Sequence, residues 1–264
     1  MWKRVGLILM SVFLLCTLTG CGDRNEGTYH VINKKLMSQS YGIGFRKGDD
    51  QVCQQVGAAL KVLSAEGRLD ELSARYLGGA ELMVEGDGAA LDDMEVSPRT
   101  LIVGFTAGSP PLAYQDSGGA LTGFDVDLAR AICDKLGWTA DLRAMDYDPE
   151  AELGSGNVDC AMGGFALTTS SQKAFSCTEG YLAYDQVLVT KNGAGYRSFG
   201  SLKKQKIGYP DGYGASAVLK ATDPVLPDDV EATPYANPAA CYDALYAGEV
   251  QGILVSSVIA AWSW

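Results

Sequence analysis

The spacing of apolar residues along the chain predicts short strands that alternate with amphipathic helices. Downstream of Thr28, a helix from Asp49 to Gly67 keeps its apolar positions at helical spacing, and Asp49 is placed to cap it. A polar turn is expected before the second strand. The elements expected in this first region are the strands 29–32 and 42–46 and the helices 50–66 and 69–77.

An acidic segment, ELMVEGDGAALDDMEVSP at 81–98, then interrupts the pattern. It contains two glycines and ends in proline, which is typical of a linker. The elements expected after it are the strands 101–103, 140–143, 158–162, 186–190, 206–209 and 250–255, a hairpin through 117–119, and helices at 125–136, at 150–153 and after Gly214 and Pro238. This alternation predicts an α/β fold with mixed, mostly parallel sheets, and the length favours two modest lobes over one large core.

The first residues read as an export signal. Lys3 and Arg4 precede an apolar run from Val5 to Leu18, which is shorter than the roughly 20 residues of a membrane-spanning helix. The run ends in Leu-Thr-Gly-Cys, which resembles the bacterial lipobox. Residues 1–20 are therefore expected to be a lipoprotein signal peptide, and Cys21 is expected to carry the lipid that anchors the chain outside the cytoplasmic membrane. The alternative is an ordinary signal peptide that contains a cysteine.

Charge and cysteine content exclude several functions. The formal net charge is −11, and removal of the leader makes it more negative, which argues against nucleic-acid binding. The cysteines after Cys21 are odd in number, so at least one thiol is free or pairs between chains. None has the close spacing of a metal site, and neither a metal nor a cofactor is expected. These cysteines, for which small buried residues are the expected role, are Cys53, Cys133, Cys160, Cys177 and Cys241.

Two motifs after the linker carry a resemblance to a known family. LIVGF at 101–105 and GFDVDLA at 123–129 resemble the opening of the family 3 solute-binding proteins of ABC importers for polar amino acids. Further matches follow in the family's order, at 157–164, 181–190, 201–208 and 247–250. The resemblance implies a type II periplasmic-binding fold, with a small solute held between two lobes and an ABC permease as partner.

The segment that the family places last stands first in this chain. YGIGFRKGDD at 41–50 and the helices up to residue 77 resemble the family's C-terminal part. The resemblance therefore implies a circularly permuted binding protein, in which 81–98 joins the ancestral termini. A truncated tandem of two binding proteins and a swapped dimer are the alternatives, and a monomer is expected.

In the permuted arrangement each lobe takes residues from both ends of the chain. Lobe 1 is expected to comprise 41–80 and 99–190, and lobe 2 to comprise 28–40 and 191–264. The two hinge strands are expected near 40–44 and 186–190.

The family's charged ligand anchors are replaced in this sequence. The resemblance places the arginine that holds the ligand carboxylate at Ser170 or Ser171, and the aspartate that holds the ammonium at Ser256. A serine reproduces neither the fork nor the charge of arginine, so an atypical recognition of the solute is expected. The family's aromatic positions fall at Ser109 and Tyr147.

The cleft is expected to be mostly neutral, with stacking surfaces, hydroxyl groups and backbone donors. Lys173 and Asp211 are candidate charges, although both are expected in solvent. The expected ligand-binding residues are Phe105, Thr106, Ser109, Tyr147, Gly163, Phe165, Thr168, Ser170, Ser171, Tyr213, Gly214 and Ser256.

Three functions remain open from the sequence. The first is a lipid-anchored receptor that delivers a small polar solute to an ABC permease. The second is an enzyme on the same fold, similar to cyclohexadienyl dehydratase. His30 is the chain's single histidine and lies in an expected strand, where a structural role is favoured over acid–base catalysis. The third is a sensor or scaffold with a degenerate pocket.

Overall fold

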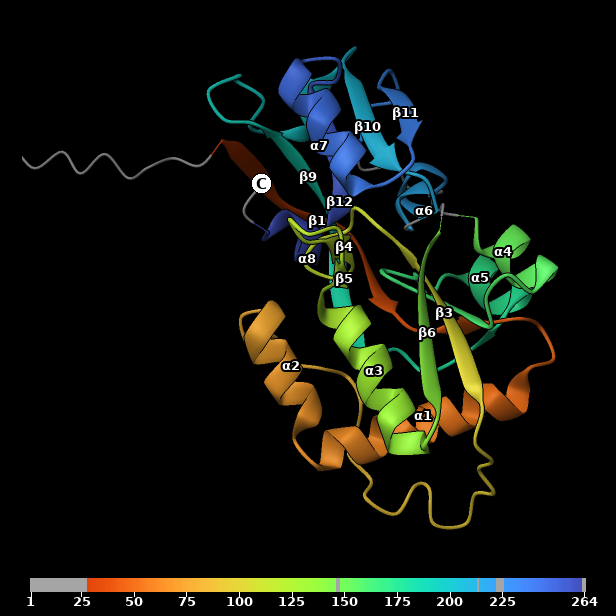
Figure 1. Ribbon diagram of the computed structural model, residues 1–264. Coiled ribbons are helices and arrows are strands. Elements are labelled where there is room, and N and C mark those ends of the chain that lie inside the picture. The colour runs from red at the N-terminus through yellow and green to blue at the C-terminus, as the bar shows by residue number, and fades with distance from the viewer. Residues whose placement is uncertain (1–27, 146–147, 213, 222–225, 263–264) are drawn as a thin grey trace, which may run out of the picture.

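The computed structural model describes residues 28–145, 148–212, 214–221 and 226–262, which form a two-lobed α/β protein. Two five-stranded sheets lie one above the other, and helices cover each of them (Figure 1). Within the described ranges, none of the helices combines the length and the apolar composition that crossing a membrane requires.

Lobe 1 is built on a mixed sheet with the strand order β6-β3-β7-β2-β8. β3 is parallel to β6 and β7, whereas β2 is antiparallel to β7 and β8. A strand that precedes the acidic segment therefore completes a sheet whose other members follow it. The bounds are β2 (Gly44–Phe45), β3 (Thr100–Thr106), β6 (Thr139–Met145), β7 (Cys160–Met162) and β8 (Ser176–Cys177).

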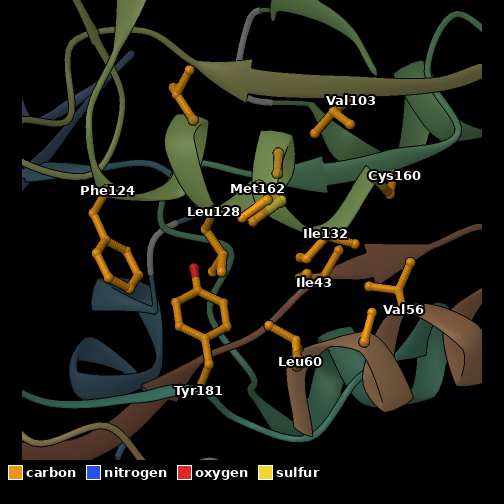
Figure 2. Packing of buried hydrophobic residues seen from close by; sticks show 14 of the residues in the cluster. Ile43, Val56, Leu60, Val103, Phe124, Leu128, Ile132, Cys160, Met162 and Tyr181 are labelled. Atoms are coloured by element: carbon orange, nitrogen blue, oxygen red, sulfur yellow. The ribbon is translucent and has the colours of Figure 1, made fainter. Parts of the chain in front are cut away.

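The core of lobe 1 also joins distant parts of the chain. Figure 2 shows Ile43, Val56 and Leu60 from the early region beside Leu128 and Ile132 from a later helix, all of them in one buried cluster. Helical apolar spacing produces this face, because it brings one side of each helix onto the sheet. The helices that pack here are α1 (Asp50–Ala65), α2 (Arg68–Tyr76) and α3 (Phe124–Leu136). A small hairpin, β4 (Tyr114–Gln115) with β5 (Leu121–Thr122), precedes α3.

Lobe 2 is built on a second mixed sheet with the order β1-β9-β12-β10-β11. β10 is parallel to β11 and β12, and β9 is antiparallel to β12 and β1. Parallel pairing is thus confined to one side of each sheet, so antiparallel pairing is more extensive than predicted. The bounds are β1 (Tyr29–Tyr41), β9 (Leu182–Lys191), β10 (Lys206–Pro210), β11 (Glu231–Tyr235), β12 (Gly252–Ser256), the 3₁₀ turn η1 (Phe199–Leu202), α6 (Ala215–Leu219) and α7 (Pro238–Ala247).

The long strands β1 and β9 connect the lobes as an antiparallel pair. Tyr41, at the end of β1, is buried in the lobe 1 core, whereas Ile32 is buried in a core cluster of lobe 2. The polar turn predicted after Ile32 is wrong, since these residues continue the strand. A register shift between Ile32 and Met37 accommodates them in the pairing.

The segment 81–98 contains no helix or strand, as predicted, yet it is fastened to lobe 1. The Gln55 side chain donates to the carbonyl oxygen of Glu95 at 2.8 Å, and the Ser64 hydroxyl donates to that of Val84 at 2.8 Å. The Trp138 indole N–H donates to the Ser97 carbonyl at 3.0 Å. The segment forms no helix or strand that would pair its backbone carbonyl groups. Side chains of α1 and of Trp138 supply hydrogen bonds to these carbonyls instead, and they hold the segment against lobe 1.

The prediction that Asp49 caps α1 is wrong. The Asp49 side chain makes no capping hydrogen bond, and its carboxylate instead accepts from the Arg46 guanidinium at 2.9 Å. The five cysteines are all free, and only Cys177 is not fully buried. Short elements such as β8 and β11 were missed, because runs of so few residues show no periodicity.

The lobes touch each other on one side of the molecule. The N–H of Ala239, at the start of α7, donates to the carbonyl oxygen of Gly108 in the loop after β3, at 3.0 Å. The rings of Tyr114 and Trp262 lie 5.4 Å apart. Elsewhere between the lobes, α6 of lobe 2 lies on the side of α4 (Pro149–Ser155) and α5 (Thr169–Ala174) of lobe 1 (Figure 1).

Candidate functional site

A cavity of ≈ 400 Å³ lies where the loops of both lobes meet. Lobe 1 contributes the start of α4, the loop after β7 and α5, and lobe 2 contributes the loop between β10 and α6. Its volume lies within the range of small-molecule sites. The described residues that line it are Asp148, Pro149, Glu150, Phe165, Ala166, Thr168, Ser170, Ser171, Ala174, Phe175, Asp211, Gly212, Gly214 and Ser216.

A similar hollow of ≈ 430 Å³ lies elsewhere, between α1, the segment 81–98 and the end of β8. All of its lining residues belong to lobe 1 or to that segment, among them Cys53, Val84 and Met94. Lobe closure cannot enclose a ligand there, because lobe 2 contributes nothing to it. Two further hollows, of ≈ 650 and ≈ 400 Å³, are likewise lined by lobe 1 residues alone. The cavity between the lobes is therefore the candidate site.

A buried carboxylate holds the lobe 1 loop that enters this cavity. The Asp125 side chain, at the start of α3, accepts from the backbone N–H groups of Gly163 and Gly164 at 2.8 and 3.0 Å. Both glycines have positive φ angles, 80° and 92°, which side-chain-bearing residues rarely adopt. The Tyr181 hydroxyl donates to the second oxygen at 2.7 Å. Burial raises the pKa of the Asp125 carboxyl group to about 6, although these three hydrogen bonds oppose the shift.

The next residues of this loop form a capping box at the start of α5. The Thr168 side chain accepts from the N–H of Ser171 at 3.1 Å, and the Ser171 side chain accepts from the N–H of Thr168 at 2.8 Å. The Ser171 hydroxyl donates to the carbonyl oxygen of Ala166 at 2.8 Å. Ser171, one of the two serines at which the resemblance places the family's arginine, thus bonds to backbone groups of its own loop.

The serine at the family's aspartate position also caps a helix. Ser256 is buried, with 3% of its surface exposed, and its side chain accepts from the N–H of Ile259 at 3.2 Å in α8 (Ser257–Ala260). It does not line the cavity. Ser171 and Ser256, at which the resemblance predicts charged anchors, therefore both form hydrogen bonds with backbone groups at the start of a helix.

A polar cluster beneath the cavity fixes Gly214. The Gln39 side chain in β1 donates to the carbonyl oxygen of Gly214 at 3.2 Å and accepts from the Tyr184 hydroxyl at 2.9 Å. The Gln186 side chain donates to the same Gln39 oxygen at 3.0 Å. Tyr184 in turn stacks on Tyr41 with ring centroids 3.9 Å apart. Side chains of both crossing strands therefore position a residue of the cavity wall.

The structure brings together only part of the predicted site. Phe165, Thr168, Ser170, Ser171 and Gly214 line the cavity, and so does Asp211, which was expected in solvent. Lys173 does not line it. Tyr147, Tyr213 and the predicted lipidation site Cys21 lie outside the described residues.

The remaining predicted residues lie away from the cavity lining. Phe105 is fully buried in the lobe 1 core, so the expectation that it faces the ligand is wrong. The Gly163 amide is occupied by Asp125, and Ser109 is buried in a tight turn with Ala113. Thr106 is 2% exposed, and its hydroxyl group has no hydrogen-bond partner among the described residues. His30 lies in β1 opposite Thr190, also outside the lining.

Sequence reasoning missed Asp148 and Glu150, the acidic residues that lobe 1 contributes to the wall. Asp148 and Glu150 flank Pro149 at the start of α4, in the pattern of an N-cap and a first helical turn, and Asp148 does accept from the N–H of Ala151 at 3.0 Å. This pattern indicates a helix start and carries no sign of a ligand. Only the tertiary structure places α4 opposite the β10–α6 loop.

The comparisons with known proteins agree with this geometry. Residues 101–250 match the family model of the bacterial extracellular solute-binding proteins, family 3. The chain belongs to this family. This confirms the resemblance to family 3, and the mixed α/β architecture with lobes of this kind confirms the predicted fold class.

Individual relatives match over part of their length. The arginine-binding extracellular protein ArtP of Bacillus subtilis (strain 168) is 29% identical over 122 residues, which cover 46% of this chain and 48% of the relative. The probable ABC transporter arginine-binding protein ArtJ of Chlamydia trachomatis serovar D is 40% identical over 87 residues, or 33% of this chain and 34% of the relative. This chain therefore spans about half the length of these curated relatives or less.

A solved structure of the same kind is similar over a longer stretch. It is the substrate-binding protein of an ABC uptake transporter from Streptococcus pneumoniae, with bound histidine. It is 26% identical, with a TM-score of 0.57, and the match covers 61% of this chain and 67% of that one. These relatives are binding proteins, in agreement with a binding role for this chain.

Proposed function

We propose that this chain is a lipid-anchored solute-binding protein of an ABC importer, which closes two lobes over a small polar solute. The observation that carries the proposal is the cavity lined by loops of both lobes, since hinged lobes bind by closing over a ligand that contacts both. The expected solute is amino-acid-like or an amino-acid derivative, and it is not held by the family's usual contacts to the α-carboxylate and α-amino groups. The serines that cap α5 and α8 support this part, because they leave no side-chain charge at either position.

A solute screen with matched variants tests the binding role. Amino acids, amines and small peptides would be added to the leader-free chain, and thermal unfolding would be followed. A bound solute is expected to raise the melting temperature in a concentration-dependent way. Ser170→Trp, which fills the cavity, should abolish the shift, whereas Thr169→Trp on the same helix, outside the lining, should preserve it. A protein that no solute stabilises would overturn the proposal.

The proposal includes a circularly permuted chain. Support comes from the two sheets, because β2 sits between β7 and β8, and β1 pairs with β9, while 81–98 links α2 to β3. The ancestral order is tested by a rearranged chain in which 99–264 is followed, through a short Gly/Ser linker, by 28–80. We expect it to be a monomer by light scattering and to bind the same solute. Light scattering that finds only dimers of the natural chain would instead favour a swapped dimer.

The anchor is proposed at Cys21, outside the cytoplasmic membrane, with an ABC permease as partner. Mass spectrometry of the protein purified from its own membranes should find a diacylglyceryl group on Cys21. The Cys21→Ser variant should lose both the lipid and the membrane association, and an unmodified thiol in the natural protein would exclude the anchor.

A further inference from the structure

The charged side chains that line the described part of the cavity are all acidic. They are Asp148 and Glu150 from lobe 1 and Asp211 from lobe 2, and the lining contains no lysine, arginine or histidine. Lys173 lies nearby on α5 but is exposed and outside the lining. A ligand here therefore meets negative charge from both lobes.

Two of these carboxylates, those of Glu150 and Asp211, have no hydrogen-bond or ion-pair partner among the residues that the structure describes. Some acidic residues elsewhere are neutralised by a neighbouring cation, as Asp127 is by Arg75 and Arg130, and Asp185 by Lys35. A cationic ligand in the cavity would therefore meet carboxylates that no described side chain already neutralises.

Closure of the lobes brings like charges towards each other across the cavity. Glu150 stands at the start of α4 and Asp211 in the loop after β10, so each lobe supplies one of them. Carboxylates that approach one another in a partly enclosed space repel, and a cation between them converts this repulsion into attraction. A cationic ligand therefore favours the closed state.

The described part of the same wall offers no cationic side chain to a carboxylate. The Ser171 hydroxyl donates to Ala166 at the position where the family has its arginine, and no lining residue carries a positive charge. The carboxylate of a free amino acid would lie close to the carboxylates of the wall and would find no cation to pair with. Burying an unpaired negative charge in this way costs free energy.

We propose that the solute is an organic cation without a carboxylate, an alkyl amine, diamine or guanidine, held between the acidic walls of the two lobes. This inference rests on the proposed binding function and names its ligand class. The cavity between the lobes is the binding site, and its three carboxylates favour a positively charged ligand.

Calorimetric titration with matched pairs tests the inference. The leader-free chain would be titrated with agmatine against arginine, cadaverine against lysine, and putrescine against ornithine, since each pair differs by one carboxylate. We expect at least one amine to bind about tenfold or more tightly than its parent amino acid, which corresponds to about 1.4 kcal/mol. Higher salt should weaken this binding, because it screens the attraction.

Charge-neutralising variants test whether the carboxylates of the cavity cause the preference for amines. Glu150→Gln and Asp211→Asn should each weaken amine binding about fivefold and reduce the preference over the amino acid. Asp229→Asn, an exposed lobe 2 residue outside the lining, should leave both unchanged. An amino acid that binds as tightly as its amine would overturn the inference and leave the binding function standing. If none of the six ligands binds, the inference fails, and the wider solute screen decides the binding function separately.

Discussion

The Tyr181 hydroxyl group donates to the Asp125 carboxylate at 2.7 Å, and both residues are fully buried. The other carboxylate oxygen accepts from the amides of Gly163 and Gly164, which directly precede Phe165 of the cavity wall. One side chain thus joins α3, the start of β9 and the loop that forms part of the candidate site. Three buried hydrogen-bond donors are paired with the Asp125 carboxylate.

Replacement of Asp125 should therefore be costly. Asp125→Ala leaves the two glycine amides without their acceptor, and unsatisfied buried donors cost about 1 to 3 kcal/mol each. We expect the free energy of unfolding in urea to fall by roughly 2 to 4 kcal/mol. Asp92→Ala, at an exposed residue of the segment 81–98, should change it by less than about 0.5 kcal/mol. Equal effects of the two variants would refute the role given to Asp125.

The same carboxyl group should make stability depend on pH. Its pKa in the folded protein is about 6, above the ordinary value of 3.8, because burial disfavours the charged form. The folded state therefore binds the proton more tightly than the unfolded state does. The resulting stabilisation is fully present below about pH 4 and is lost as the pH rises through about 6, by up to about 3 kcal/mol.

Comparison with Asp125→Asn isolates this contribution, since asparagine does not titrate. Unfolding free energies would be measured for both proteins at intervals from pH 4 to pH 7. The advantage of the natural protein over the variant should shrink across this range. A constant difference between the two proteins would show that Asp125 does not titrate there.

Two glycines of the early region should respond in opposite ways to alanine. A Cβ atom at Gly44 would overlap the ring of Phe165, whereas one at Gly57, within α1, would have no atom within 4 Å. Gly44→Ala should lower the free energy of unfolding by about 1 to 3 kcal/mol because the ring must move. Gly57→Ala should raise it by about 0.5 to 1 kcal/mol, since alanine favours the helix. Chemical denaturation measures both, and a neutral Gly44→Ala would contradict the packing of Phe165 against β2.

The polar cluster beneath the cavity should contribute to stability through Gln39. Gln39→Ala removes the acceptor of the Tyr184 hydroxyl and the donor to Gly214. We expect a loss of about 1 to 3 kcal/mol in the free energy of unfolding. Gln54→Ala, an exposed glutamine of α1, provides the matched control and should change it by less than about 0.5 kcal/mol. If both variants unfold alike, the cluster does not hold β1 to the wall of the cavity.

Apolar periodicity alone predicted the long helices of the chain. α1 and α3 lie within a few residues of their predicted bounds, because a helix that packs on a sheet needs apolar residues at intervals that only a helix produces. The family resemblance added the order of these elements and the positions of Ser171 and Ser256. Short elements such as β8 and β11 stayed hidden, since their few residues pair only because neighbouring strands are already in place.

The sequence by itself determined the α/β class and the family, since these depend on residue types and spacings along the chain, and it predicts serines at the family's charged anchor positions. The tertiary structure alone decided what these serines contact. Ser171 belongs to the capping box of α5 and Ser256 is the N-cap of α8, because nearby backbone groups supply their partners, and Glu150 shares a cavity with Asp211 because two separate sheets bring their loops together. No local pattern encodes that meeting, as it depends on contacts between residues far apart in the chain.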